Sequence, residues 1–156
     1  MIRLIQVVLL SLYFSNVFAV DIGTTIPSCD ALDLAEHKGK VLYVDFWATW
    51  CPPCKKSMPF LNALRNELEE KGFEIIAVNV DEDSEVAREF LENYPVDYQV
   101  VFDPKGVCPA IFDVKAMPSS FFIDRHGKIR YEHLGFRDDD EVEIKARVLE
   151  LLKEVP

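Results

Sequence analysis

Two cysteines, Cys51 and Cys54, stand where an apolar run, residues 41–47, gives way to a helical pattern. Pro52 and Pro53 separate them. Proline suits the first turn of a helix, because the N–H that it lacks would have no partner there. We therefore expect a buried strand, a stiff turn and a helix that begins at the cysteines.

The expected position of the thiols gives them different chemistry. Cys51 would lie at the start of the helix, where unpaired backbone N–H groups and the positive end of the dipole favour a thiolate. Cys54, one turn further in, falls on the same side of the helix and can attack a mixed disulfide formed on its neighbour. Cys51 is thus the candidate nucleophile and Cys54 the candidate resolving thiol.

Two other uses of this spacing are less favoured. A zinc ribbon needs a second cysteine pair, whereas Cys29 and Cys108 stand alone with no His within a few residues of either. An inert disulfide over so short a loop would constrain the unfolded chain little. Redox chemistry is the favoured interpretation, with no metal and no small-molecule cofactor.

The length, 156 residues, of which 49% are hydrophobic, is enough for one domain with its own core. Residues 1–19 have the pattern of a secretory signal: Arg3, an apolar run at 4–14, and small residues, Val17 and Ala19, before the cleavage point. We expect cleavage after Ala19 and a single domain over 20–156. An uncleaved membrane anchor is the alternative, although the run is short for a span.

The chain is acidic, with a formal net charge of −10, and loss of the single charge of Arg3 with the signal takes it to −11. An acidic domain without a basic cluster is a poor candidate for binding nucleic acid. Export also favours lasting disulfides, so thiols that cycle there need a partner that supplies or removes electrons.

The hydrophobic pattern predicts strands that alternate with helices, followed by an antiparallel hairpin. This order implies a three-layer α/β sandwich around a mixed central sheet, with the thiols at the carboxyl end of a central strand. The expected strands are 41–47, 73–80, 98–102, 119–123 and 128–133, and the later helices are 84–94, 107–112 and 139–153.

Some details are more specific. Ser84 is the expected N-cap of the second helix. The last helix is expected to be amphipathic through Val142, Leu149 and Leu152. His37, His126 and His133 fall in expected surface segments, and we assign them no role.

Residues 44–54, together with 117–124, 127–129 and the stretch Ala-Val-Asn-Val-Asp-Glu at 77–82, resemble the thioredoxin superfamily. More narrowly, they resemble the TlpA/ResA/DsbE group of exported thiol:disulfide oxidoreductases, over about residues 22–153. The resemblance implies a thioredoxin-like fold with a helix and strand inserted at about 84–102.

The resemblance also implies a cis bond between Met117 and Pro118, facing the cysteines. A proline without an N–H leaves the backbone of the preceding residue free to pair with a client strand. Met117 and Pro118 are therefore expected to bind the client, together with Pro52, Pro53 and an exposed Trp50. Trp47 is expected in the core.

Two acids match positions of interest in the family. Asp45 coincides with the buried acid of thioredoxins, and in an apolar run its pKa should be raised, which suits it to exchange a proton with Cys54. The alternative is an acid that only caps backbone groups near the strand end. Glu82 matches an acidic residue near the thiols of ResA-like proteins; alternatively, Asp81, Glu82 and Asp83 form a solvated turn.

Once Cys51 is paired with Cys54, the remaining pairing is Cys29 with Cys108. Such a bridge would tie the N-terminal arm to the inserted region, and some TlpA-like proteins carry a second disulfide. The alternative is two separate buried thiols, which behave as small apolar side chains.

The expected function is a periplasmic thiol:disulfide oxidoreductase, a monomer that mostly reduces client disulfides. The resemblance suggests clients of the cytochrome c maturation or copper-site assembly type, and a membrane thiol reductase as electron donor. One alternative is a net oxidant, as in DsbA-like proteins. Another is a copper-binding chaperone that uses the same cysteines, for which only Met58 and Met117 offer further soft ligands.

Overall fold

The computed structural model describes residues 21–155, so the predicted signal peptide, residues 1–19, lies outside the described residues. The helices are α1 (Pro52–Leu68), α2 (Ser84–Asn93), α3 (Val107–Ile111) and α4 (Asp140–Leu152). The strands are β1 (Val41–Trp47), β2 (Phe73–Asn79), β3 (Gln99–Phe102), β4 (Ser119–Ile123) and β5 (Ile129–Leu134). Short 3-10 turns, Ala35–His37 and Glu69–Lys71, precede β1 and β2.

The five strands form one mixed sheet in the order β3-β2-β1-β4-β5. The pairs β1–β2 and β2–β3 are parallel, whereas β1–β4 and β4–β5 are antiparallel. Every residue of β1, β2 and β4 is buried, which explains why their sequences are nearly continuous apolar runs. The structure confirms the predicted mixed sheet, including the inserted helix and strand, α2 and β3.

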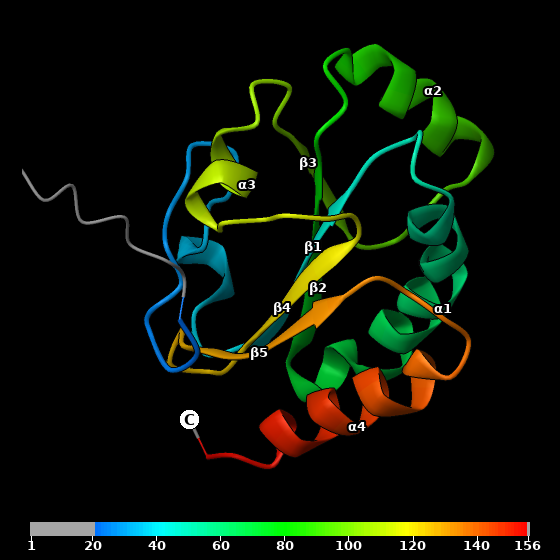
Figure 1. The fold of residues 1–156 in the computed structure, drawn as a ribbon. Helices are drawn as coiled ribbons and strands as arrows, with labels where there is room; N and C mark the ends of the chain where they lie inside the picture. Colours follow the sequence, from blue (N-terminus) through cyan, green and yellow to red (C-terminus); the bar gives the residue numbers. More distant parts are fainter. Residues whose placement is uncertain (1–20, 156) are drawn as a thin grey trace, which may run out of the picture.

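Helices cover both faces of this sheet (Figure 1). Successive side chains of β1 point to opposite faces, so Val41, Tyr43 and Trp47 join one core cluster while Leu42 and Phe46 join another. The first cluster lies under α1, α2 and α4. The second lies under α3 and the N-terminal arm, residues 21–40. This is the predicted three-layer arrangement.

Two helical details differ from the prediction. The N-cap of α2 is Asp83, not Ser84, because the Asp83 carboxylate accepts a hydrogen bond from the Glu85 N–H at 3.0 Å. In α4 the expected face was right in part: Leu149 and Leu152 are partly buried against the core, but Val142 is not. Val142 is 77% exposed, and the buried stripe is instead Ile144, Val148 and Leu151, which follows the i, i+4, i+7 spacing of a helix.

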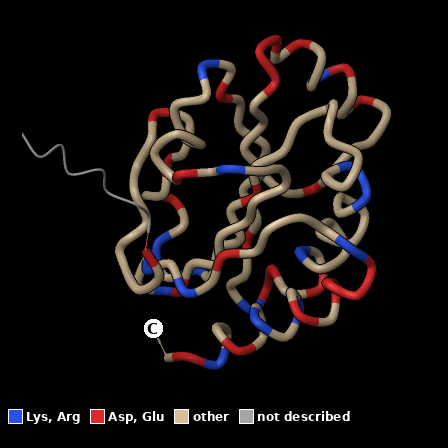
Figure 2. Tube along the Cα trace, viewed as in Figure 1, with Lys and Arg blue, Asp and Glu red and all other residues tan. Residues whose placement is uncertain are grey.

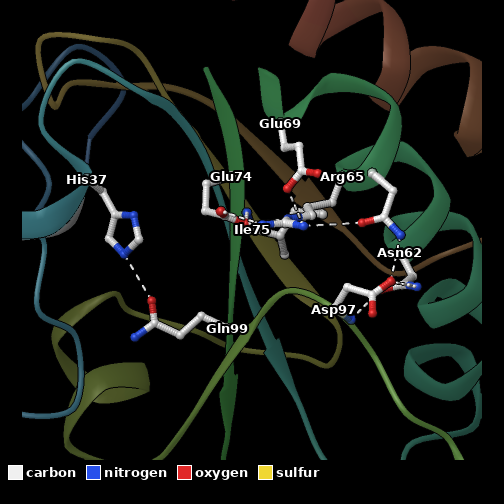
Figure 3. Close-up of polar contacts among 9 residues, drawn as sticks. His37, Asn62, Arg65, Glu69, Glu74, Ile75, Asp97 and Gln99 are labelled. Carbon is white, nitrogen blue, oxygen red and sulfur yellow. Dashed lines mark hydrogen bonds and ion pairs between the residues drawn. The ribbon is translucent and has the colours of Figure 1, made fainter. Parts of the chain in front are cut away.

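Polar contacts fix the edge strand β3 to both neighbouring layers (Figure 3). On one side Asp97 accepts hydrogen bonds from the amides of Asn62 and Asn66 on α1, at 2.9 and 2.6 Å. On the other side the His37 ring lies 2.9 Å from the side-chain oxygen of Gln99. His37 is therefore buried, contrary to the expected surface position.

The surface carries many acidic side chains. Figure 2 marks acidic positions along α2 and the turn that precedes it. The exposed ones are Glu82, Asp83, Glu85, Glu89 and Glu92. Within residues 21–155 none of the helices combines the length and the apolar character that crossing a bilayer requires.

Candidate active site

Helix α1 begins directly after Cys51, as predicted. Cys51 is the N-cap residue, with extended backbone angles (φ −101°, ψ 101°), and Pro52 and Pro53 occupy the first turn. The Cys54 N–H points at the Cys51 sulfur, with N and Sγ 3.3 Å apart. A backbone donor at a helix start stabilises negative charge on that sulfur, so the local structure favours the thiolate of Cys51.

The two sulfurs are bonded to each other in this structure, which is the oxidised state. They differ in access, since Cys51 keeps 3% of its surface exposed whereas Cys54 keeps none. Cys51 also lines a surface hollow, and Cys54 does not. A client sulfur can therefore reach Cys51 directly, whereas Cys54 can react only with a disulfide already formed on Cys51.

The hollow beside Cys51 has a volume of about 510 Å³ and a mainly apolar lining. We call it the active-site hollow. It is lined by Trp50, Cys51, Pro52, Pro53, Pro109, Val114, Lys115, Ala116 and Met117. The sequence-predicted client residues Trp50, Pro52, Pro53 and Met117 thus lie together around the thiol.

The Met117–Pro118 peptide bond is cis, as the resemblance implied. Met117 is half-buried at the rim of the active-site hollow, whereas Pro118 is buried behind it and does not line it. The Pro118 carbonyl accepts a hydrogen bond from the Gly135 N–H at 2.8 Å. Trp50, which also lines the hollow, is 65% exposed, and Trp47 is fully buried in the core as expected.

Asp45 is a buried carboxyl in the middle of the sheet. It pairs with Ala77 of β2 and with Ser120 of β4, and the Ser120 hydroxyl donates to its Oδ1 at 2.7 Å. Burial raises the pKa of Asp45 to about 7, and the hydrogen bond from Ser120 offsets part of that rise. Alternation along β1 puts its side chain on the face that α1 covers, the face on which Cys54 is buried.

The acidic turn after β2 divides into a buried and an exposed part. Glu82 is exposed, and its predicted catalytic role stays a prediction. Asp81 is buried: its carboxylate accepts hydrogen bonds from the Thr49 N–H and hydroxyl, both at 2.9 Å, and from the Asn79 amide at 2.7 Å. It therefore holds the loop that leads into Cys51.

Sequence reasoning missed Asp81, although a signal existed. Asp81 follows the end of β2 just as Thr49 follows the end of β1, and these strands are parallel. Carboxyl ends of parallel strands meet at one edge of a sheet, so the first acid after β2 is the one placed to meet the active-site loop.

Cys29 and Cys108 form a second disulfide, with their Cα atoms 5.4 Å apart. It joins the N-terminal arm to α3, which follows the inserted residues 84–102. Cys108 is fully buried and Cys29 is 9% exposed. Across residues 21–155 no three His, Cys, Asp or Glu side chains gather in a way that could hold a metal ion.

Comparisons with known proteins agree with this geometry. The model of the Redoxin family matches residues 27–149. The thiol-disulfide oxidoreductase ResA of Bacillus cereus is 35% identical over 138 residues, which is 84% of this chain and 80% of that protein. ResA of Geobacillus kaustophilus is 31% identical over 148 residues, covering 90% of this chain and 83% of that protein.

A solved structure from Chlorobium tepidum, described as a thiol:disulfide interchange protein DsbE, is 38% identical with a TM-score of 0.84. The match covers 86% of this chain and 99% of that one. A thioredoxin-like sheet, a cysteine pair at a helix start and a cis proline accompany these matches. The chain therefore belongs to the Redoxin family, as a thiol:disulfide oxidoreductase of the TlpA/ResA/DsbE-like group of the thioredoxin superfamily.

Proposed function

We propose that this enzyme acts in the periplasm and mainly reduces disulfides of client proteins. The observation that carries the proposed thiol–disulfide chemistry, in either direction, is Asp45, a buried carboxyl with a pKa raised to about 7 on the same side of the sheet as Cys54. A group that changes protonation near neutral pH can take the proton of a buried thiol and later return it. Release of a reduced client needs that proton transfer.

The first step is attack by the Cys51 thiolate on one sulfur of the client disulfide. A bond forms between Cys51 Sγ and that sulfur, the client's S–S bond breaks, and its other sulfur leaves as a thiolate. The N–H groups at the start of α1 favour the attacking thiolate. The apolar active-site hollow, with Trp50 and Met117 on its rims, would hold the client segment next to the cysteine.

The second step is carried out by Cys54. Its thiol gives a proton to the Asp45 carboxylate, and the resulting thiolate attacks Cys51 Sγ. The mixed disulfide breaks, the client leaves as a thiolate, and the Cys51–Cys54 disulfide found in the structure is formed. Because Cys54 is fully buried, a carboxylate on the same face of the sheet is a better proton acceptor for it than bulk water.

Each cycle consumes two electrons, so an electron donor must reduce Cys51–Cys54 again. We propose a membrane thiol reductase as donor, and clients of the cytochrome c maturation or copper-site assembly type. The sequence pattern of residues 1–19 supports export, and the second disulfide supports an oxidising compartment, where such bonds persist. We expect the enzyme to act as a monomer.

Equilibration with glutathione tests the direction of the reaction. We expect the Cys51–Cys54 couple to have a potential at or below about −230 mV, in the range of reducing members of the fold. A potential near the roughly −120 mV of strong oxidants would favour net oxidation of clients instead.

Trapping tests the roles of the cysteines and would identify the client. A Cys54→Ser variant cannot complete the second step, so it should retain clients as mixed disulfides on Cys51. Cys51→Ser is the matched control and should retain none. Adducts that form through Cys29 or Cys108 would contradict the assignment of roles.

A further inference from the structure

We infer that the Cys29–Cys108 disulfide shapes the active-site hollow and so acts as a positioning element for client recognition. The inference rests on the proposed role of this hollow as the client site, and it does not depend on whether clients are reduced or oxidised.

The hollow has two walls that come from different parts of the chain. One wall is residues 50–53, which carry Cys51. The other consists of Pro109, on α3, and residues 114–117, which follow α3. The Val114 N–H donates to the Pro109 carbonyl at 2.9 Å, which connects the two parts of this outer wall. The position of α3 therefore sets the width of the hollow.

Helix α3 has only five residues and no side-chain hydrogen bond at its N-cap, Gly106. A helix of one turn is not stable alone, so contacts with the rest of the protein must hold it. Two of these are the Asp103 carboxylate, which accepts from the Cys108 N–H at 2.6 Å, and the disulfide itself. Phe112, just after α3, packs against Phe46 with ring centroids 5.2 Å apart.

The other end of the disulfide is attached to the sheet. The N-terminal arm runs along the β4–β5 hairpin, where the Ile129 N–H donates to the Thr24 carbonyl at 2.9 Å and the Ile26 N–H donates to the Gly127 carbonyl at 2.8 Å. Cys29 follows three residues later. The disulfide thus links Cys108, next to Pro109 of the outer wall, to the arm that is hydrogen-bonded to the hairpin.

The physical consequence is preorganisation of the client site. If the outer wall adopted the binding arrangement only a tenth of the time without the disulfide, the apparent affinity for a client would fall about tenfold. The reactivity of Cys51 itself would not change, since its helix start belongs to the opposite wall.

Single-turnover kinetics of the full chain, with Cys51 and Cys54 reduced, test this inference. The probe is a ten-residue apolar peptide whose one cysteine is linked as a mixed disulfide to thionitrobenzoate. Attack by Cys51 on the peptide sulfur releases coloured thionitrobenzoate, the better leaving thiolate. Ellman's reagent, a small disulfide that needs no groove, is the comparison substrate.

For a Cys29→Ala/Cys108→Ala variant we expect the half-saturating peptide concentration to rise about tenfold. The limiting rate, and the rate with Ellman's reagent, should stay within about twofold of the native values. Asp103→Ala keeps the disulfide but removes the hydrogen bond from the Cys108 N–H, another contact that holds α3; it should cause a smaller rise and remains informative if the double variant fails to fold. An unchanged half-saturating concentration in both variants, or equal losses with both substrates, would overturn the inference.

Ala116→Tyr separates this inference from the function on which it rests. Ala116 is exposed on the outer wall, so a larger side chain there should obstruct the hollow and weaken peptide binding. If this variant binds the peptide normally, the hollow is not the client site, and the proposed client-binding role fails. If it weakens binding while the disulfide variants do not, only the role of the disulfide fails.

Discussion

Replacement of Asp45 by Asn should stabilise the oxidised protein at neutral and alkaline pH while it impairs the enzyme. Burial raises the pKa of this carboxyl from 3.8 to about 7. Between these values the folded protein keeps a proton that the unfolded chain has released, so a rise in pH favours unfolding. Asn has nearly the same shape, can accept the hydrogen bond from Ser120, and does not titrate.

The size of the effect follows from the shift. A rise from 3.8 to about 7 corresponds to roughly 4 kcal/mol of stability lost by the native protein above neutral pH. About 1.5 kcal/mol of that loss is already present at pH 5, so roughly 2.5 kcal/mol develops between pH 5 and pH 8. The buried Asn amide adds its own cost, which does not vary with pH.

Urea unfolding of the native protein and Asp45→Asn, with the disulfides intact, measures this difference at pH 5 and pH 8. We expect the variant to gain about 2.5 kcal/mol relative to the native protein over this interval. Glu82→Gln is the control, because Glu82 is exposed, and it should gain nothing. A pH-independent difference for Asp45→Asn would refute the raised pKa and, with it, the proton-transfer role.

Three further predictions concern the second disulfide and the active-site loop. A mild reductant should open only the active-site disulfide, so that alkylation of the native protein adds two labels by mass spectrometry, because Cys51 lines the active-site hollow whereas Cys29 and Cys108 do not. Cys29→Ala/Cys108→Ala should lose about 4.5 kcal/mol in denaturant unfolding, since that bond spans 79 residues. Asp81→Ala should lose about 2 to 3 kcal/mol, because it leaves three donors without an acceptor.

For each of these three predictions one outcome would contradict the reasoning. Four labels without denaturant would show that the second disulfide is accessible. A loss of less than about 1 kcal/mol for the double alanine variant would mean that the bridge barely restricts the unfolded chain. Glu82→Ala is the matched control for Asp81→Ala, and equal losses in the two would contradict the assignment of Asp81 as the residue that holds the loop.

The features that could be predicted from the sequence are those that depend on residues adjacent along the chain. The helix start at Cys51 follows from the adjacent prolines, and the buried strands follow from continuous apolar runs such as 41–47. The raised pKa of Asp45 also follows from its place within such a run. In these cases local pattern and tertiary environment impose the same structure.

Features that depend on distant contacts were harder to predict. The apolar residues of α4 fit more than one stripe, and only packing against the sheet selects Ile144 and Val148 over Val142. His37 is buried against Gln99, a partner 62 residues away along the chain, so its sequence neighbours do not reveal its burial. Asp81 and Glu82 are adjacent acids in one turn, and the choice between them depends on the loop that carries the cysteines.

The central claim is that Cys51 is the more acidic and more accessible thiol. The direct measurement is the rate of alkylation of each reduced cysteine by iodoacetamide as a function of pH, with the labelled residue identified by peptide mapping. We expect Cys51 to be labelled first, with a pKa below the roughly 8.5 of a free cysteine. Labelling of Cys54 first, or a Cys51 thiol that reacts no faster than free cysteine near neutral pH, would contradict the account.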